Sequence, residues 1–201
     1  MLRDGSDEEI ITVFFEFELE SYEKGISKLE ILLNSEESSL PKGIYPAHIY
    51  YSIELRMYIS WELSYLEKRE NDISGLEAAL APLDERFHRI RDAHLEKYVS
   101  QLLKNLQSTI ENLYPDYVIK DDDFFEAYLR DRNAIEAIRQ ELEQFTDISK
   151  ELEELRKQDE IFINLIPEAV RLKTYFPDDL VEAPPEIWWR HLEEKYGKMD
   201  W

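Results

Sequence analysis

Residues 6–33 of the chain, SDEEIITVFFEFELESYEKGISKLEILL, indicate the fold most clearly. Apolar side chains recur through this stretch at steps of three or four residues, at Ile11, Phe15, Leu19, Tyr22, Ile26, Leu29 and Leu33. This spacing places them on one side of an α-helix. Ser6, followed three residues later by Glu9, has the form of a capping box at a helix N-terminus. The stretch therefore predicts a long helix that packs along a partner.

The next segments repeat the helical spacing. Residues 46–70 predict a second helix with a wide apolar face, at Ile49, Ile53, Met57 and Trp61, which is flanked by Tyr50, Tyr58 and Tyr65. Ser74 and Glu77 form another capping pair, which predicts a short helix that Pro82 stops or kinks. Residues 83–113 predict a third long helix, in which His94 belongs to the apolar stripe with Phe87 and Ile90.

The second half of the chain predicts two more main helices and a tail. One helix follows Asp123, which could cap it, and the other contains Leu152, Leu155, Phe162 and Ile166. Pro167 is expected to restart or kink the chain. A short helix is expected from about Pro185, with Gly197 at its C-terminal end.

Composition agrees with a helical class. The 201 residues include 5 Gly and no Cys, and no segment alternates β-branched residues as a strand would. The absence of Cys excludes a disulfide framework, a zinc ribbon and thiol catalysis. We expect an all-α, single-domain helical bundle over residues 1–201, with about five main helices plus short ones. Its core bundle would span about residues 6–166, and a Trp-rich C-terminal helical appendage about residues 167–201.

Charge is the most unusual global property. The 24 Lys and Arg face 45 Asp and Glu, which gives a net charge of −21. Residues 1–40 and 115–160 each carry −8, whereas residues 82–114 are neutral. Such a chain repels phosphates, so direct nucleic-acid binding is not expected. A basic protein partner is expected instead, because complementary potentials steer encounter, although acidity for solubility alone is an equally physical explanation.

The candidate partner-binding residues follow from these acidic blocks and from the tail. Helices need charge only on the faces turned away from the core, which leaves two clusters for a partner: Glu16, Glu18, Glu20 and Glu23, and Glu151, Glu153 and Glu154. Trp188 and Trp189 are adjacent and point about 100° apart on a helix, so both cannot enter one core face. One of them is expected to dock the tail and the other to lie at a rim or partner surface.

One short motif points to an enzyme. Arg89 and His94 are separated by four residues, RIRDAH, and this pattern is similar to the catalytic motif of the HEPN ribonucleases. The resemblance implies an all-helical, dimeric, metal-independent ribonuclease in which His94 acts as general base and Arg89 stabilises the phosphorane charge. It covers six residues, and Ile90 stands where that family usually has a polar residue. A hydrogen-bonded core histidine is the simpler interpretation of His94.

Other chemical sites are not indicated. Glu85 and His88 form a single Glu-x-x-His step, whereas a di-iron bundle needs that step on two helices. Asp121, Asp122 and Asp123 lack the glycine and the terminal glutamate of a calcium loop. The sequence has no Gly-rich phosphate loop and no Gly-x-Ser-x-Gly elbow. We therefore expect no metal and no cofactor.

These observations favour a binding protein over an enzyme. The sequence predicts an acidic helical module that binds or neutralises a basic protein, such as an immunity or antitoxin-type protein, an adaptor subunit or an assembly factor. The ribonuclease is the alternative, and a homodimer is possible under either function. No 18-residue apolar run and no cleavable hydrophobic leader is seen, so we expect a cytoplasmic protein without a membrane span.

Overall fold

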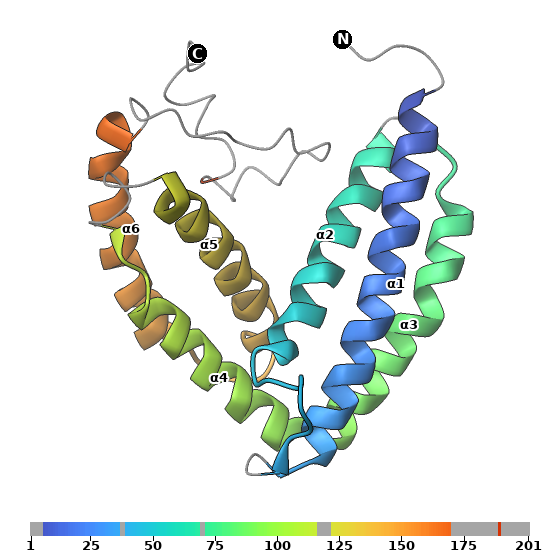
Figure 1. Ribbon diagram of the computed structural model, residues 1–201, viewed down its shortest axis with the longest axis horizontal. Coiled ribbons are helices and arrows are strands. Elements are labelled where there is room, and N and C mark those ends of the chain that lie inside the picture. The colour runs from blue at the N-terminus through green and yellow to red at the C-terminus, as the bar shows by residue number, and fades with distance from the viewer. Residues whose placement is uncertain (1–5, 37–38, 69–70, 116–121, 170–188, 190–201) are drawn as a thin grey trace. The chain divides into compact units, whose positions relative to one another are not determined.

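The computed structural model describes residues 6–36, 39–68, 71–115, 122–169 and 189 (Figure 1). Over these residues the chain is all-helical and contains no strand, which confirms the predicted class. The helices are α1 (Ser6–Asn34), α2 (His48–Lys68), α3 (Ser74–Ala93), α4 (Leu95–Glu111), α5 (Asp122–Leu142) and α6 (Ser149–Ala169). In the part of the chain that the structure describes, no helix has both the length and the apolar character needed to cross a membrane.

Two compact units make up the chain, Met1–Gln101 and Leu102–Trp201. The boundary falls inside α4, so unit 1 contains α1, α2, α3 and the start of α4, and unit 2 contains the rest. The prediction of a single domain over residues 1–201 stays a prediction. Each unit is therefore described by itself.

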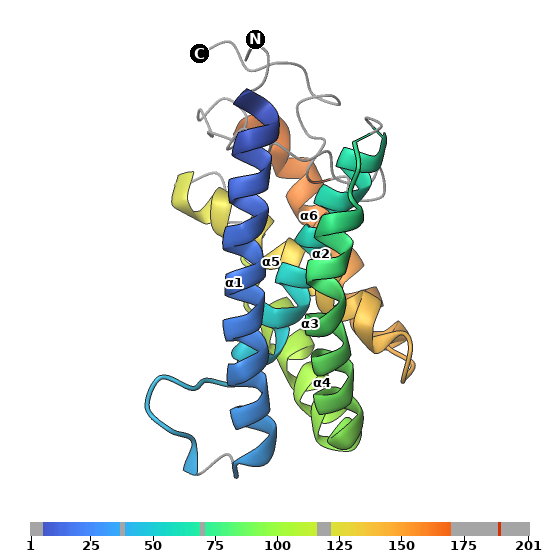
Figure 2. The same cartoon turned by 90° about the vertical axis from the view of Figure 1, so that its right-hand side faces the viewer.

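In unit 1, α1 packs against α2 and α3, and two perpendicular views show the three helices as a bundle (Figures 1 and 2). The predicted stripe of α1 forms its buried side, with the most buried members at Phe15, Tyr22, Ile26, Leu29 and Leu33. Lys28, near the end of α1, contacts His48 at the start of α2, with 3.3 Å between Nζ and Nε2. Helices α1 and α2 therefore run antiparallel.

Polar ties join the three helices of unit 1. Asp84 of α3 accepts a hydrogen bond from the Tyr22 hydroxyl of α1 at 2.9 Å and one from Arg56 Nε of α2 at 2.9 Å. A second tie joins Arg86 Nη2 of α3 to Glu30 Oε2 of α1 at 2.7 Å. Because Asp84 receives a donor from each of the other two helices, it fixes the register of all three.

Gly25 allows α1 to approach α2 closely. A Cβ atom at this position would lie 2.9 Å from Ser52 Oγ, which is closer than van der Waals contact permits. Ser52 is fully buried, and its Oγ has no hydrogen-bond partner in the described part of the chain. A glycine inside a helix costs about 1 kcal/mol relative to alanine, but here the missing side chain makes room for the neighbouring helix.

The boundaries of α3 and α4 differ from the prediction. Helix α3 begins at Ser74, continues through Pro82 and ends at Ala93, so Pro82 does not stop it. The N-cap residue is Ile73, not the predicted Ser74, and the Ser74 backbone N–H donates to Asp72 Oδ1 at 3.0 Å. Pro82 is exposed, as is Ala78, whose carbonyl loses its helical donor. Water can therefore satisfy that carbonyl, which explains why the helix tolerates the proline.

A break at His94 divides the predicted helix over residues 83–113 into two. His94 has φ −130° and ψ 29°, and its backbone N–H bonds to the Arg91 carbonyl at 3.0 Å, three residues back. Beyond the break, Lys97 Nζ donates to the carbonyls of Leu32 and Leu33, each at 2.9 Å, and to that of Ser35. The last turn of α1 has no basic residue of its own, so Lys97 caps its unpaired carbonyls.

In unit 2, α5 is buried all the way round over one segment. Residues 132–138 are buried without interruption, whereas buried and exposed residues would alternate along a helix with one packed face. Tyr128 of α5 stacks on Phe162 of α6, with ring centroids 4.0 Å apart. Asp147 Oδ1 accepts the Ser149 N–H at 2.9 Å and caps α6. Helix α6 continues past Pro167 to Ala169, so the predicted restart at that proline does not occur.

Candidate protein-binding surface

The outward side of α1 carries an exposed aromatic ring among acidic residues. A helix turns about 100° per residue, so Phe17 lies about 200° around the axis from Phe15. Accordingly, Phe15 is fully buried and Phe17 is 66% exposed. Glu16, Glu20 and Glu23 are exposed on the same helix. We call these four residues, Glu16, Phe17, Glu20 and Glu23, the Phe17 face.

The carboxylates of the Phe17 face remain available to another molecule. Glu20 Oε1 lies 2.6 Å from Lys24 Nζ, but both side chains are more than three-fifths exposed. An exposed pair of this kind stabilises a helix by a few tenths of a kcal/mol, so a partner cation can replace Lys24 at little cost. Three of the residues were predicted from the sequence, whereas Phe17 was not. Its position outside the buried stripe was the signal that could have identified it.

Glu18 does not belong to this surface, which corrects the prediction for that residue. Its side chain is half-buried and lies close to that of Glu62 of α2. Burial raises the pKa of Glu18, although the interaction with Glu62 partly offsets this effect. Burial and the neighbouring Glu18 carboxylate raise the pKa of Glu62 to about 8. The acidic cluster of α1 therefore has three outward members and one inward member.

The predicted acidic cluster of α6 is largely matched by cations of the same helix. Arg156 pairs with Glu153 at 2.9 Å and also with Glu160, and Lys157 pairs with Glu154 at 3.0 Å. These Arg156 interactions lower the pKa of Glu153. Glu151 accepts a hydrogen bond from Gln107 Nε2 at 2.9 Å. Glu151 and Glu154, both predicted to bind a partner, thus have partners within the chain.

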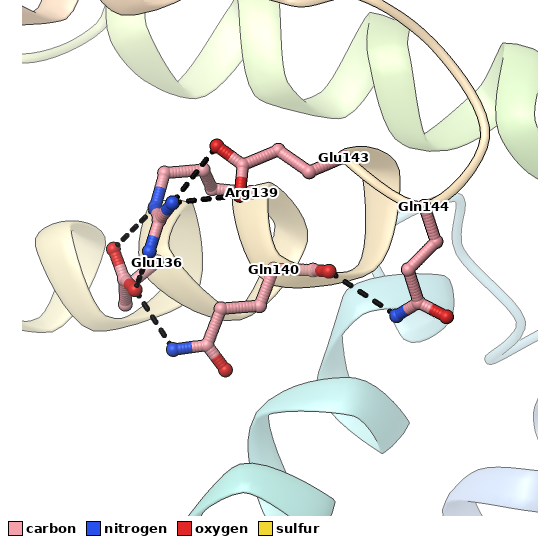
Figure 3. Close-up of polar contacts among 5 residues, drawn as sticks. All are labelled: Glu136, Arg139, Gln140, Glu143 and Gln144. Atoms are coloured by element: carbon pink, nitrogen blue, oxygen red, sulfur yellow. Dashed lines mark hydrogen bonds and ion pairs between the residues drawn. The ribbon is translucent and has the colours of Figure 1, made fainter.

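Helix α5 carries a similar self-compensated cluster (Figure 3). The Arg139 guanidinium bridges two carboxylates, with Nε 2.9 Å from Glu136 Oε2 and Nη1 2.8 Å from Glu143 Oε2. Gln140 Nε2 donates a second hydrogen bond to Glu136 at 2.8 Å. These bonds outweigh burial and lower the pKa of Glu136. Several described carboxylates of residues 115–160 therefore have a cation nearby, as Glu20 of the Phe17 face has Lys24.

Trp189 docks inside unit 2 instead of presenting a surface. The side chain is 2% exposed, and its Nε1 donates to Asn133 Oδ1 of α5 at 2.8 Å. The Arg132 guanidinium lies over the indole ring at 4.0 Å, in a cation–π contact. This position matches the expectation that one tryptophan docks the tail. Trp188, the predicted tail helix and the rest of the appendage lie outside the described residues.

Arg132 is nearly fully buried and depends on its neighbours for compensation. Its Nε lies 2.9 Å from Asp159 Oδ1 of α6, an ion pair whose N–H does not point at the oxygen. The Tyr128 hydroxyl donates to the same Asp159 oxygen at 3.1 Å. Burial lowers the pKa of Arg132 and raises that of Asp159. We regard this network as structural, because it joins α5, α6 and Trp189 to one another.

The Arg89–His94 motif is not assembled into a site by the described residues. Arg89 is exposed on α3, whereas His94 is half-buried at the break between α3 and α4. The prediction that His94 belongs to a continuous apolar stripe is therefore wrong. Over the described ranges, no three His, Asp or Glu side chains converge in a manner that could hold a metal ion.

Comparisons with known proteins give no relationship for this chain: no family model, no curated protein and no solved structure matches it.

Proposed function

We propose that the protein is an acidic helical interaction module that binds a basic protein through the Phe17 face of α1. The observation that carries the proposal is the position of Phe17, which is 66% exposed on a helix whose other side is fully packed. Large exposed aromatic side chains with a charged rim are typical of binding surfaces. The rim here is acidic, and the chain as a whole has a charge of −21.

The two kinds of residue would contribute in different ways. Carboxylates at the rim accelerate encounter with a basic surface, an effect that weakens as salt shortens the Debye length, which is about 8 Å at 0.15 M. Phe17 would act after encounter, because covering its ring removes apolar area from water. Burying such a ring stabilises a complex by about 2 kcal/mol, or roughly thirtyfold in affinity.

The chemistry of the face favours a different protein over a second copy of this chain. Two acidic faces repel each other, so a homodimer built on Glu16, Glu20 and Glu23 is disfavoured. The expected partner has an apolar cleft for a phenyl ring, surrounded by Lys or Arg. A cytoplasmic toxin neutralised by an immunity or antitoxin-type protein fits this description, as does the client of an adaptor or assembly factor. The ribonuclease alternative gains no support from the positions of Arg89 and His94.

The experiment begins with the full chain, tagged and purified from the cells that produce it, and mass spectrometry identifies the stoichiometric partner. Association and dissociation rates are then measured with purified partner for three variants. Glu16→Gln/Glu20→Gln/Glu23→Gln should slow association several-fold, and the slowing should disappear at high salt. Phe17→Ala should leave association nearly unchanged and speed dissociation about tenfold or more.

A matched control removes charge elsewhere. Glu153→Gln/Glu154→Gln removes two exposed carboxylates from a different helix, so it should slow association less than the α1 substitutions if the Phe17 face directs binding. Equal effects of the α1 and α6 substitutions would show that net charge, and not the Phe17 face, directs binding. The proposal is refuted if the association and dissociation rates of the partner change neither with salt nor in the Phe17→Ala variant.

A further inference from the structure

Two acidic side chains, Glu18 of α1 and Glu62 of α2, meet inside unit 1. Glu62 is 7% exposed, and Glu18 is half-buried. Each of the two is a neighbour that shifts the pKa of the other, so their carboxyl groups lie close together. The second oxygen of each, Oε2, is buried and has no hydrogen-bond partner in the described part of the chain. Among the described residues, no cation is bonded to either of these two carboxyl groups.

A hydrogen bond between these two carboxyl groups would require a proton. An ionised carboxylate can only accept, so a bond between two carboxyl groups exists only if one of them is protonated and donates. If both were ionised, two like charges would stand side by side in a poorly hydrated interface, with their remaining oxygens unsatisfied. Burial and the nearby second carboxyl group therefore favour a state in which the pair carries one proton.

Among the described residues, four charged groups of this three-helix bundle, Arg56, Asp84, Arg86 and Glu30, are engaged with one another or with Tyr22. Tyr22 of α1 and Arg56 of α2 both bond to Asp84 of α3, and Arg86 of α3 bonds to Glu30 of α1. On α2, Glu54 accepts a hydrogen bond from the Tyr58 hydroxyl at 3.4 Å. The groups that determine the ionisation of Glu62 are therefore its own burial and Glu18.

We propose that Glu18 and Glu62 hold one proton between them at neutral pH, and that losing this proton loosens the packing of α1 on α2. The pair would act as a pH-sensitive latch in unit 1. While the proton is present, a neutral acid and a carboxylate share a short polar contact between the helices. After its loss, two buried negative charges repel across the same contact. This inference does not depend on the proposed partner, because it concerns the chain alone.

The direction of the pH effect follows from proton linkage. Glu62 has a pKa of 4.5 when unfolded and of about 8 when folded, so between these values the folded state binds more protons. The stability that this proton contributes is fully present below pH 4.5 and is lost as pH rises through about 8. Between these values the unfolding constant rises by up to about tenfold per pH unit. His48 acts in the opposite direction, because its lowered pKa costs stability as pH falls below 6.5. Measurements from pH 6.5 to 9 therefore follow the titration of Glu62 above the range in which His48 acts.

The test measures thermal unfolding of the full chain by circular dichroism from pH 6.5 to 9, at constant ionic strength. The melting temperature of the native sequence should fall by several degrees across this window. Glu62→Gln keeps the donor and removes the titration, so its profile should be flat, and it should melt above the native sequence at pH 9. Glu67→Gln, an exposed acid of the same helix, should retain the native profile.

Two results would overturn the inference. A Glu62→Gln profile as steep as the native one would assign the titration to another group. Recovery of the native melting temperature at pH 9 by millimolar Mg²⁺ or Ca²⁺, but not in Glu62→Gln, would show that the pair holds a cation and not a proton. If Glu62→Gln does not fold, ¹³C NMR can follow the titration of the glutamate carboxyl groups in the native chain. The inference is refuted if every glutamate titrates below pH 6.

Discussion

The contact between Gly25 and Ser52 allows a quantitative test of how α1 packs on α2. Gly25→Ala should gain about 1 kcal/mol from helix propensity. The new Cβ would lie 2.9 Å from Ser52 Oγ in a fully buried site, and overpacking of this kind costs about 1–3 kcal/mol. We therefore expect a net loss of about 1 kcal/mol. Ser52→Ala removes a buried hydroxyl that has no partner, so it should gain about 1 kcal/mol.

In the background of Ser52→Ala, the effect of Gly25→Ala on the free energy of unfolding should change from destabilising to stabilising. Without Oγ, the nearest Ser52 atoms to the new Cβ are its Cα and Cβ at 3.6 Å, which is ordinary contact. Gly25→Ala/Ser52→Ala should then be about 2 kcal/mol more stable than the native chain, with a coupling of about 2 kcal/mol between the sites. Urea unfolding followed by circular dichroism at pH 6.5 measures all four members of the cycle.

Gly75→Ala serves as the control for this cycle, since a Cβ there meets nothing within 4 Å. It should be neutral or slightly stabilising. Two outcomes would refute the reasoning: a Gly25→Ala variant at least as stable as the native chain, or single effects that add within about 0.5 kcal/mol. Either would mean that α1 and α2 are free to separate at this point.

Two further substitutions test the ties described above. Lys97→Met removes the ammonium that caps the last turn of α1 and should lower the free energy of unfolding by about 1–2 kcal/mol, as measured by urea unfolding. Lys104→Met, on the exposed side of α4, is its control, and equal losses would contradict the capping role. Trp189→Phe removes the 2.8 Å bond to Asn133 and weakens the contact with Arg132, so it should cost about 2 kcal/mol by the same assay. Unchanged stability would show that the indole is not needed for unit 2.

The sequence predicts the helices well where burial is one-sided. The apolar steps of α1 identify its core positions, because a three-to-four-residue period leaves one packed face. The same reasoning misplaced the end of α3. Pro82 indicated a stop, but an exposed proline lacks only one donor and can be tolerated. No local feature marked the break at His94, since Phe87, Ile90 and the later stripe keep an unbroken period.

The candidate surface was predicted only in part for a related reason. Counting charge locates acidic blocks, but it does not tell which carboxylates face inward or have a cation nearby. Glu18 resembles Glu16 and Glu20 in sequence, yet its angular position brings it to α2. The pairing of Glu18 with Glu62 joins residues 44 positions apart and leaves no local trace. Such long-range pairs require the packing of whole helices to be known.

The docking of Trp189 has a consequence for the order of events during synthesis. Asn133 and Trp189 are 56 residues apart, so a ribosome adding about 5–20 residues per second makes them about 3–11 s apart. Every group that ties α1, α2, α3 and Lys97 together has by then been translated. The residues of the first bundle are therefore all available to fold while the Arg132 guanidinium still lacks its contact with Trp189.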